Sequence, residues 1–164
     1  SNWPMTRWMM VAALVAGMAQ AKDDAAVPDV SLDQVKFGAV VNGMELKQDE
    51  LKGKVVVVER WGTRCGPCVA FLPELAKIHR RYDSRGLQVV GMEVQQSDKE
   101  AIMELCDDAR VKYPVVKGGQ VPVKSAGIPH ACVFGADGKL VWAGNPHDDA
   151  FLDAVKDALR ELRK

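Results

Sequence analysis

The sequence predicts an α/β sandwich in which helices cover a central sheet of mixed direction. Apolar runs suited to buried strands alternate with segments whose apolar residues recur at helical spacing. The chain then closes with two short strands joined by a turn and with an amphipathic helix. Its 164 residues, 48% of them hydrophobic and 27% charged, suit one globular domain.

The balance of charges argues against a nucleic-acid partner. Lysine and arginine number 22, and aspartate and glutamate number 22, so the formal net charge is zero. Nucleic-acid-binding domains usually carry a basic excess, so we expect no nucleic-acid partner. The 4 cysteines are too few for a disulfide scaffold, but they are enough for a redox pair or a metal site.

Residues 1–21 predict an export signal. Arg7 is followed by an uncharged stretch from Trp8 to Ala21, which ends in Ala19-Gln20-Ala21. The stretch is short for a membrane span, which needs ~20 apolar residues. We therefore expect a periplasmic or secreted protein, weakly anchored to the membrane if the signal stays uncleaved. Residues 22–34 are expected to be a linker and residues 35–164 the folded domain.

The first half of the domain predicts a hairpin, a strand and a helix. Residues 35–41 and 44–46 flank Asn42-Gly43, a pair that favours the type I′ turn of a β-hairpin. Four consecutive valines, residues 55–58, predict a central strand covered on both faces. A helix is expected over residues 69–82, kinked at Pro73.

The second half predicts the remaining elements. A strand is expected over 87–94, and Ser97 with Glu100 predicts a capping box for a helix over 98–110. Residues 113–116 are expected to be extended and 117–125 to be a loop. Two strands, 131–134 and 139–143, flank Asp137-Gly138. Asp148 or Asp149 is expected to begin a final helix that runs to Lys164.

The motif Cys65-Gly66-Pro67-Cys68 lies between the valine strand and the first helix. A zinc site would need a second ligand pair, which Cys106 and Cys132 do not form. Haem attachment would need histidine at position 69, where the chain has valine. A permanent disulfide would close too small a loop to stabilise the fold much. The spacing therefore favours a dithiol that cycles to a disulfide.

The place of the motif assigns a role to each sulfur. Unpaired N–H groups and the helix dipole stabilise a thiolate at a helix N-terminus. We expect Cys65 to be the exposed nucleophile and Cys68, one turn further in, to resolve the mixed disulfide. Pro67 fits the first turn of the helix, where it costs no hydrogen bond.

The segment ERWGTRCGPC, residues 59–68, resembles the active-site segment of thioredoxin. Pro73 matches the kinking proline of the thioredoxin helix. Gly127-Ile128-Pro129 resembles the family's cis-proline loop, and residues 134–144 resemble its closing hairpin. The predicted N-terminal hairpin, residues 51–54 and Tyr113-Pro114 are more similar to the exported TlpA and ResA branch. Over residues 35–164 the chain is therefore identified as thioredoxin-like.

The resemblance implies further site residues. Pro129 would be cis and lie opposite the cysteines, and Ile128 would offer main-chain hydrogen bonds to a substrate. Glu59 would be a buried carboxylate that exchanges a proton with Cys68. Trp61 would support the site by packing. Gly66 and Pro67 would border the bound substrate, and Gly-Pro between the cysteines resembles reducing thioredoxins.

Two positions depart from the family pattern. Arg64 stands where tryptophan is usual, and it would either favour the Cys65 thiolate and steer acidic partners or be a solvated side chain without effect. His130 replaces a small polar residue, and it would either tune Cys65 or point to solvent. His79 and His147 are expected at the surface. Cys106 and Cys132 are expected to be two buried thiols, with pairing to each other left open.

The sequence thus predicts an exported thiol–disulfide oxidoreductase that acts on protein substrates as a reductant, without cofactor or metal. We expect a monomer that a membrane electron donor recharges. One alternative is an oxidase that donates disulfides. Another is a copper or metal chaperone on the same fold, although copper-binding relatives space their cysteines by three residues and this chain spaces them by two.

Overall fold

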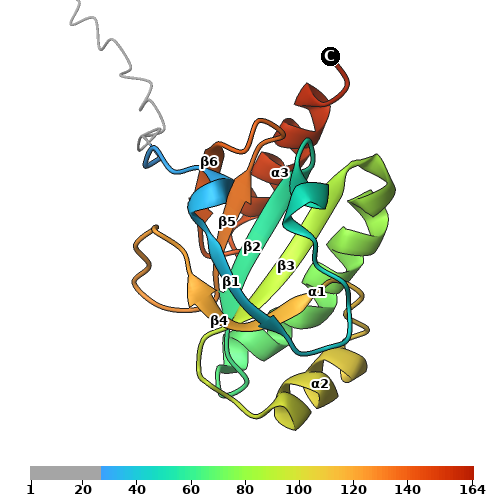
Figure 1. The fold of residues 1–164 in the computed structure, drawn as a ribbon, viewed down its shortest axis with the longest axis vertical. Helices are drawn as coiled ribbons and strands as arrows, with labels where there is room; N and C mark the ends of the chain where they lie inside the picture. The colour runs from blue at the N-terminus through green and yellow to red at the C-terminus, as the bar shows by residue number, and fades with distance from the viewer. Residues whose placement is uncertain (1–26) are drawn as a thin grey trace, which may run out of the picture.

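The computed structural model describes residues 27–164, so the export signal expected over residues 1–21 lies outside the described residues. Helices and strands alternate around one six-stranded sheet of order β1-β4-β3-β2-β5-β6 (Figure 1). Its strands are β1 (Lys36–Val40), β2 (Val55–Trp61), β3 (Leu87–Glu93), β4 (Val115–Gln120), β5 (His130–Phe134) and β6 (Leu140–Gly144). β2, β3 and β4 are parallel, and the other pairings are antiparallel. The predicted α/β fold with a mixed sheet is confirmed.

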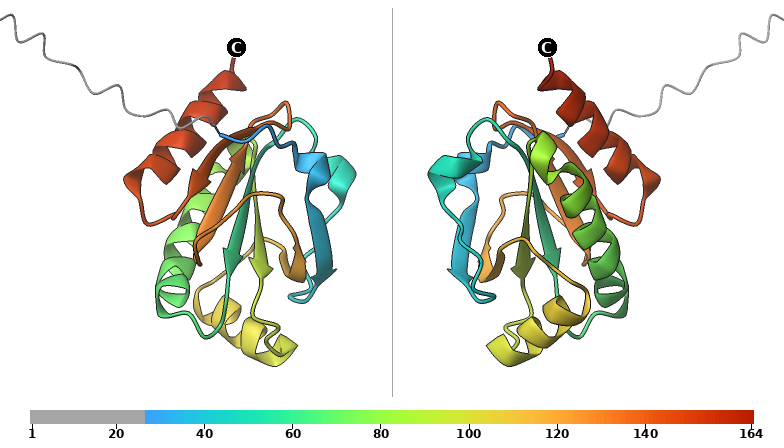
Figure 2. Two further views of the ribbon diagram at one scale, coloured as in Figure 1. Left: turned by 90° about the vertical axis from the view of Figure 1, so that its left-hand side faces the viewer. Right: turned by 90° about the vertical axis from the view of Figure 1, so that its right-hand side faces the viewer.

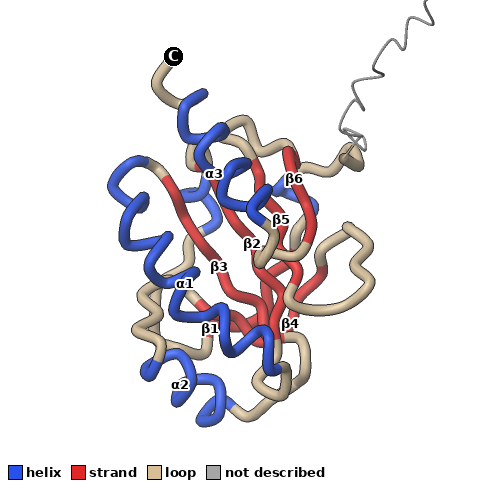
Figure 3. Tube along the Cα trace, turned by 180° about the vertical axis from the view of Figure 1, so that it is seen from behind, coloured by secondary structure: helices blue, strands red, loops and turns tan. Residues whose placement is uncertain are grey.

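Within residues 27–164, three α-helices complete the fold. They are α1 (Gly66–Tyr82), α2 (Lys99–Asp108) and α3 (Asp149–Glu161). α1 and α3 cover one face of the sheet, and the 3-10 helix at Leu32–Gln34 lies toward the other side (Figure 2). Seen from behind, α1 and α3 cross in front of the strands (Figure 3).

The sheet separates two hydrophobic clusters, because alternate residues of a strand point to opposite faces. On β2, Val57 and Trp61 belong to the helix-side cluster, and Val56 and Val58 belong to the other. All three α-helices contribute side chains to the helix-side cluster, among them Phe71, Leu72, Leu75, Ile102 and Phe151. The second cluster is closed by the N-terminal residues Val30, Val35 and Leu51.

The predicted N-terminal hairpin is wrong. Residues 44–46 form no strand, and β1 pairs instead with β4, which lies far along the chain. Asn42 explains the difference, since its Nδ2 donates to the carbonyl of Tyr113 at 2.8 Å and its Oδ1 accepts from the Val115 N–H at 3.0 Å. The side chain thus binds the backbone leading into β4 and does not build a tight turn.

Three other expectations need correction. Gly118 and Gly119, expected to be part of a loop, belong to β4. The strand continues through them because β1 supplies hydrogen-bonding partners for β4. α2 begins after Asp98, and no capping box involves Ser97, whose hydroxyl instead lies 2.6 Å from that of Thr63. His79 is 7% exposed and not at the surface, since it lies on the inner side of α1 with its ring against Tyr113.

The segment just before β1 packs on the domain. Val30 is buried, the Leu140 N–H donates to its carbonyl at 2.9 Å, and Ser31 bridges to Lys139. A short 3-10 helix follows at Leu32–Gln34. They belong to residues 22–34, which the sequence analysis expects to be a linker, so the packed structure begins before residue 35.

Candidate active site

Cys65 and Cys68 lie where the chain passes from the end of β2 into α1. Cys65 is the N-cap residue of α1, and the Cys68 N–H donates to its Sγ at 3.2 Å. The two sulfurs form a disulfide in this structure, with Cα atoms 5.2 Å apart. Cys65 is partly exposed and Cys68 is 0% exposed. An incoming sulfur therefore reaches Cys65 and not Cys68.

The loop before β5 faces the exposed sulfur. The Ile128–Pro129 peptide bond is cis, as the resemblance implied. The Ile128 carbonyl oxygen lies 3.7 Å from the Cys65 Sγ. Ile128 is partly exposed and Pro129 is buried, so the backbone at Ile128 is available beside the reacting sulfur.

Glu59 is a buried acid on β2. It is 0% exposed, and neither carboxylate oxygen has a hydrogen-bond partner among the described residues. Burial alone raises the pKa of its carboxyl well above the ordinary value. By strand alternation its side chain lies on the helix side of the sheet, between Val57 and Trp61, where Cys68 also packs.

A second buried acid, Glu93, holds the loop that leads to Cys65. Its oxygens accept the backbone N–H groups of Thr63 at 3.3 Å, Gln95 at 2.8 Å and Ser97 at 3.2 Å. Burial raises the pKa of this carboxyl, but the hydrogen bonds from Ser97, Gln95 and Thr63 outweigh burial, so the pKa is lowered overall. The sequence analysis did not identify Glu93, which lies near the end of the strand expected over residues 87–94.

Arg64 is exposed and bound to Gln95. Its backbone N–H donates to the Gln95 Oε1 at 2.7 Å, and its Nη2 donates to the Gln95 carbonyl at 3.3 Å. Gly62 makes this possible, because a Cβ there would lie 2.2 Å from the Gln95 Cδ. Gln95 is a second residue that the sequence analysis missed.

His130 is buried beside Arg60. It is 7% exposed, so it does not point to solvent, and its Nδ1 lies 2.9 Å from the Arg60 Nη2. Burial, and then the charge of Arg60, lower its pKa to about 4. It also lies 4.0 Å from the Cys132 Sγ, on the sheet face opposite the helices.

The remaining predicted residues divide by exposure. Trp61 is 0% exposed, so it packs and does not touch a substrate, whereas Gly66 and Pro67 are exposed beside the cysteines. His147 is exposed as expected, but its Nε2 lies 2.9 Å from the Pro67 carbonyl and its ring packs against Phe71. It therefore ties the start of α3 to the first turn of α1.

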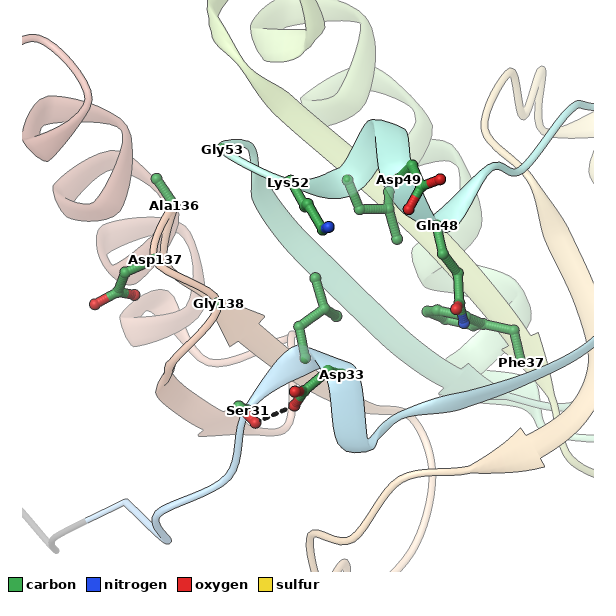
Figure 4. A pocket seen from close by; sticks show the side chains of 12 residues that line it. Ser31, Asp33, Phe37, Gln48, Asp49, Lys52, Gly53, Ala136, Asp137 and Gly138 are labelled. Atoms are coloured by element: carbon green, nitrogen blue, oxygen red, sulfur yellow. Dashed lines mark hydrogen bonds between the residues drawn. The ribbon is translucent and has the colours of Figure 1, made fainter.

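A separate hollow of about 320 Å³ lies at the other end of β2 (Figure 4). It is lined by the two 3-10 segments before β2 and by the turn between β5 and β6, including Asp33, Phe37, Lys52 and Asp137. Gly53, which lines this hollow, precedes the start of β2, whereas Cys65 follows the end of β2. The hollow is therefore not part of the cysteine site.

No helix within residues 27–164 is long and apolar enough to cross a membrane. No three histidine, cysteine, aspartate or glutamate side chains in the same range gather as ligands for a metal ion.

Comparison with known proteins assigns the family. The Redoxin family model matches residues 21–160. The chain belongs to the Redoxin family. The thiol-disulfide oxidoreductase ResA of Bacillus subtilis is 28% identical over 133 residues, which is 79% of this chain and 70% of that protein. ResA of Bacillus thuringiensis subsp. konkukian is 26% identical over 106 residues, 62% of this chain. The match to this second relative spans 60% of its length.

Solved structures agree with this family. A thiol:disulfide interchange protein of the thioredoxin family from Chlorobium tepidum superposes with a TM-score of 0.68 at 25% identity, covering 83% of this chain and 99% of that one. A thiol-disulfide isomerase from Corynebacterium glutamicum gives a TM-score of 0.65 at 26% identity, covering 82% and 97%. The predicted resemblance to thioredoxin-like proteins of the ResA type is confirmed.

Proposed function

We propose that this Redoxin-family chain is a thiol–disulfide oxidoreductase that exchanges its Cys65–Cys68 pair with protein substrates. The observation that carries the proposal is the asymmetry of the pair. Cys65 is partly exposed at the N-cap of α1, where its sulfur accepts a hydrogen bond from the Cys68 N–H. Cys68 is fully buried one turn later. A nucleophile and a resolving thiol need these two environments.

In the reducing direction the protein begins as a dithiol. The Cys65 thiolate attacks a substrate disulfide, which forms a mixed disulfide and releases one substrate thiolate. The Cys68 thiolate then attacks the Cys65 sulfur and releases the second substrate thiolate. The protein ends with the Cys65–Cys68 disulfide, and the substrate has gained two electrons and, after protonation, two protons.

The surrounding residues support these steps. The Cys68 N–H and the start of α1 stabilise the Cys65 thiolate. The Ile128 backbone, whose carbonyl lies 3.7 Å from the Cys65 Sγ, offers hydrogen bonds to an extended substrate segment. Glu59 lies on the cysteine side of the sheet, where its carboxylate can accept the proton that Cys68 loses as it attacks, and burial, which raises the pKa of Glu59, makes that carboxylate a stronger base.

Reduction is the direction we favour, because the Gly-Pro pair between the cysteines resembles that of reducing thioredoxins, and the resemblance to the TlpA and ResA branch implies reduction in the cell envelope. In this reading the protein acts outside the cytoplasm after export by residues 1–21, as a monomer, and a membrane electron donor restores the dithiol. The alternative direction, in which the protein donates disulfides, uses the same geometry.

Two measurements test the proposal. Purified protein should catalyse reduction of an insulin-type disulfide by a small dithiol, and Cys65→Ser should abolish this turnover. Wild-type activity no higher than that of Cys65→Ser would overturn the enzyme assignment. The reduction potential of the pair then decides the direction, since about −270 mV indicates a reductant and about −120 mV an oxidant.

A further inference from the structure

Arg60 is a partly buried cation without a carboxylate partner. It follows Glu59 on β2 and, by alternation, its side chain lies on the sheet face opposite the helices. Its Nη2 donates to the Val123 carbonyl at 2.8 Å and lies 2.9 Å from the His130 Nδ1, while its Nε is buried and has no hydrogen-bond partner. No ion pair joins Arg60 to a carboxylate within residues 27–164.

The neighbours of Arg60 leave its charge uncompensated. The guanidinium stays protonated at any physiological pH and can only donate hydrogen bonds. His130 therefore accepts through Nδ1 and is neutral, in keeping with a pKa lowered to about 4 by burial and by Arg60. A charge shielded from water without a counter-charge is costly, and a bound anion would relieve that cost.

A hollow of about 430 Å³ opens beside this guanidinium. Its lining includes Arg60, the apolar side chains of Met92, Val94 and Val121, and the cis-proline loop at Gly127 and Ile128. Ile128 connects the hollow to the chemistry, because its carbonyl is the group that lies 3.7 Å from the Cys65 Sγ. The hollow and the Cys65 sulfur therefore border the same residue of the cis-proline loop.

We propose that this hollow is a substrate subsite for an acidic side chain, and that Arg60 is the residue that sets this specificity. The inference rests on the proposed function, in which an extended substrate segment pairs with the Ile128 backbone. Residues of an extended segment rise by ~3.3 Å each, so a side chain about one or two positions from the substrate cysteine reaches the hollow. Its methylene stem contacts the apolar lining and its carboxylate accepts from Arg60.

Matched peptides test this specificity. Each contains one cysteine in a mixed disulfide with a chromogenic aromatic thiol, and each pair differs only by Asp or Asn at one of the two positions on either side of that cysteine. Reduced wild-type protein should react about tenfold faster with the Asp peptide than with the Asn peptide at one of these positions, as a charge-assisted hydrogen bond predicts. Arg60→Gln should bring that ratio close to one, and Arg60→Lys should retain part of it.

Lys124→Gln is the control, because it removes the same charge from an exposed side chain in the loop next to Val123. It should leave the Asp-to-Asn ratio unchanged. A wild-type ratio near one at all four positions, a ratio that survives Arg60→Gln, or an equal loss in Lys124→Gln would overturn the proposal. If Arg60→Gln does not fold, the wild-type ratio read against Lys124→Gln decides in the same way. Failure to react with any peptide would instead contradict the proposed function.

Discussion

Glu59 and Glu93 are both 0% exposed, and they lie on adjacent parallel strands, yet their surroundings move their pKa values in opposite directions. Glu59 has no hydrogen-bond partner, so burial raises the pKa of its carboxyl. Glu93 is buried too, but the N–H groups of the loop before Cys65 bind its carboxylate, and its pKa is lowered. Burial thus favours the protonated form of Glu59, and the hydrogen bonds from the loop favour the ionised form of Glu93.

The first prediction concerns the pH dependence of stability. Because the folded pKa of Glu59 exceeds its unfolded value of about 4.3, folding is penalised increasingly as pH rises from there through the folded pKa. Glu59→Gln should therefore gain stability relative to wild type between pH 5 and pH 8, measured by urea unfolding. The same variant should slow thiol exchange at neutral pH by at least about tenfold if Glu59 exchanges a proton with Cys68.

Glu93→Gln is the matched control for this prediction. In the wild-type protein, the lowered pKa of the folded Glu93 carboxyl stabilises the fold above the unfolded pKa. This stabilisation is lost as pH falls through the folded pKa. Glu93→Gln should therefore lose about 1–3 kcal/mol at pH 7 and less in acid. A Glu59→Gln variant that is less stable than wild type at pH 8, in parallel with Glu93→Gln, would contradict the assignment of an unpaired buried acid.

At the scale of elements, the side chain of Asn42 joins the residues just after β1 to the start of β4. Its amide makes one hydrogen bond to Tyr113 and one to Val115, as a strand backbone would. Asn42→Ala should cost about 1–3 kcal/mol of unfolding free energy, because it leaves two backbone groups unpaired at the start of β4. Denaturant unfolding checks this value.

Glu45→Ala is a suitable control in the same segment. Its carboxylate is exposed and pairs only with Lys47 at 3.1 Å, a kind of contact that contributes little. The variant should unfold at the wild-type denaturant concentration. Equal stability of Asn42→Ala and Glu45→Ala would show that the bonds from Asn42 do not hold β1 to β4.

Asn42 also shows what local pattern can and cannot predict. The valine run of β2, the Cys65–Cys68 motif and the helical spacing of α1 are local signals, and the elements that they predict are present. Asn-Gly is a local hairpin signal too, but the true partner of β1 lies some 80 positions further along the chain, as in the pairing of Lys36 with Gln120. Long-range pairing overrides turn preference here.

The same limit applies to the site. Sequence spacing and resemblance identified Cys65, Cys68, Glu59 and the cis Pro129, because each belongs to a recognisable motif. The roles of Glu93, Gln95 and Arg60 depend on contacts between segments some 30 to 70 positions apart. No periodicity or motif marks such contacts, so they required the three-dimensional arrangement.

At the scale of the whole molecule, the sheet keeps the other two cysteines apart. Cys106 of α2 packs in the helix-side cluster, and Cys132 of β5 packs in the cluster on the opposite face. Both are free thiols, so the sheet itself prevents the pairing that the sequence left open. Burial, with the nearby charges of Asp107 and Glu59, raises the pKa of Cys106 to about 12.

The last prediction follows from this separation. Burial raises the pKa of Cys132 to about 11 despite the opposing charge of Arg60, so neither buried thiol presents a thiolate at pH 8. Native oxidised protein should therefore resist iodoacetamide, and unfolding it in denaturant without reductant should yield two labels by mass spectrometry, on Cys106 and Cys132. No label after unfolding would reveal a second disulfide and would contradict the placement of these cysteines on opposite faces.

After reduction of the native protein, Cys65 should label first, because it is the cysteine that combines solvent access with a helix N-terminus.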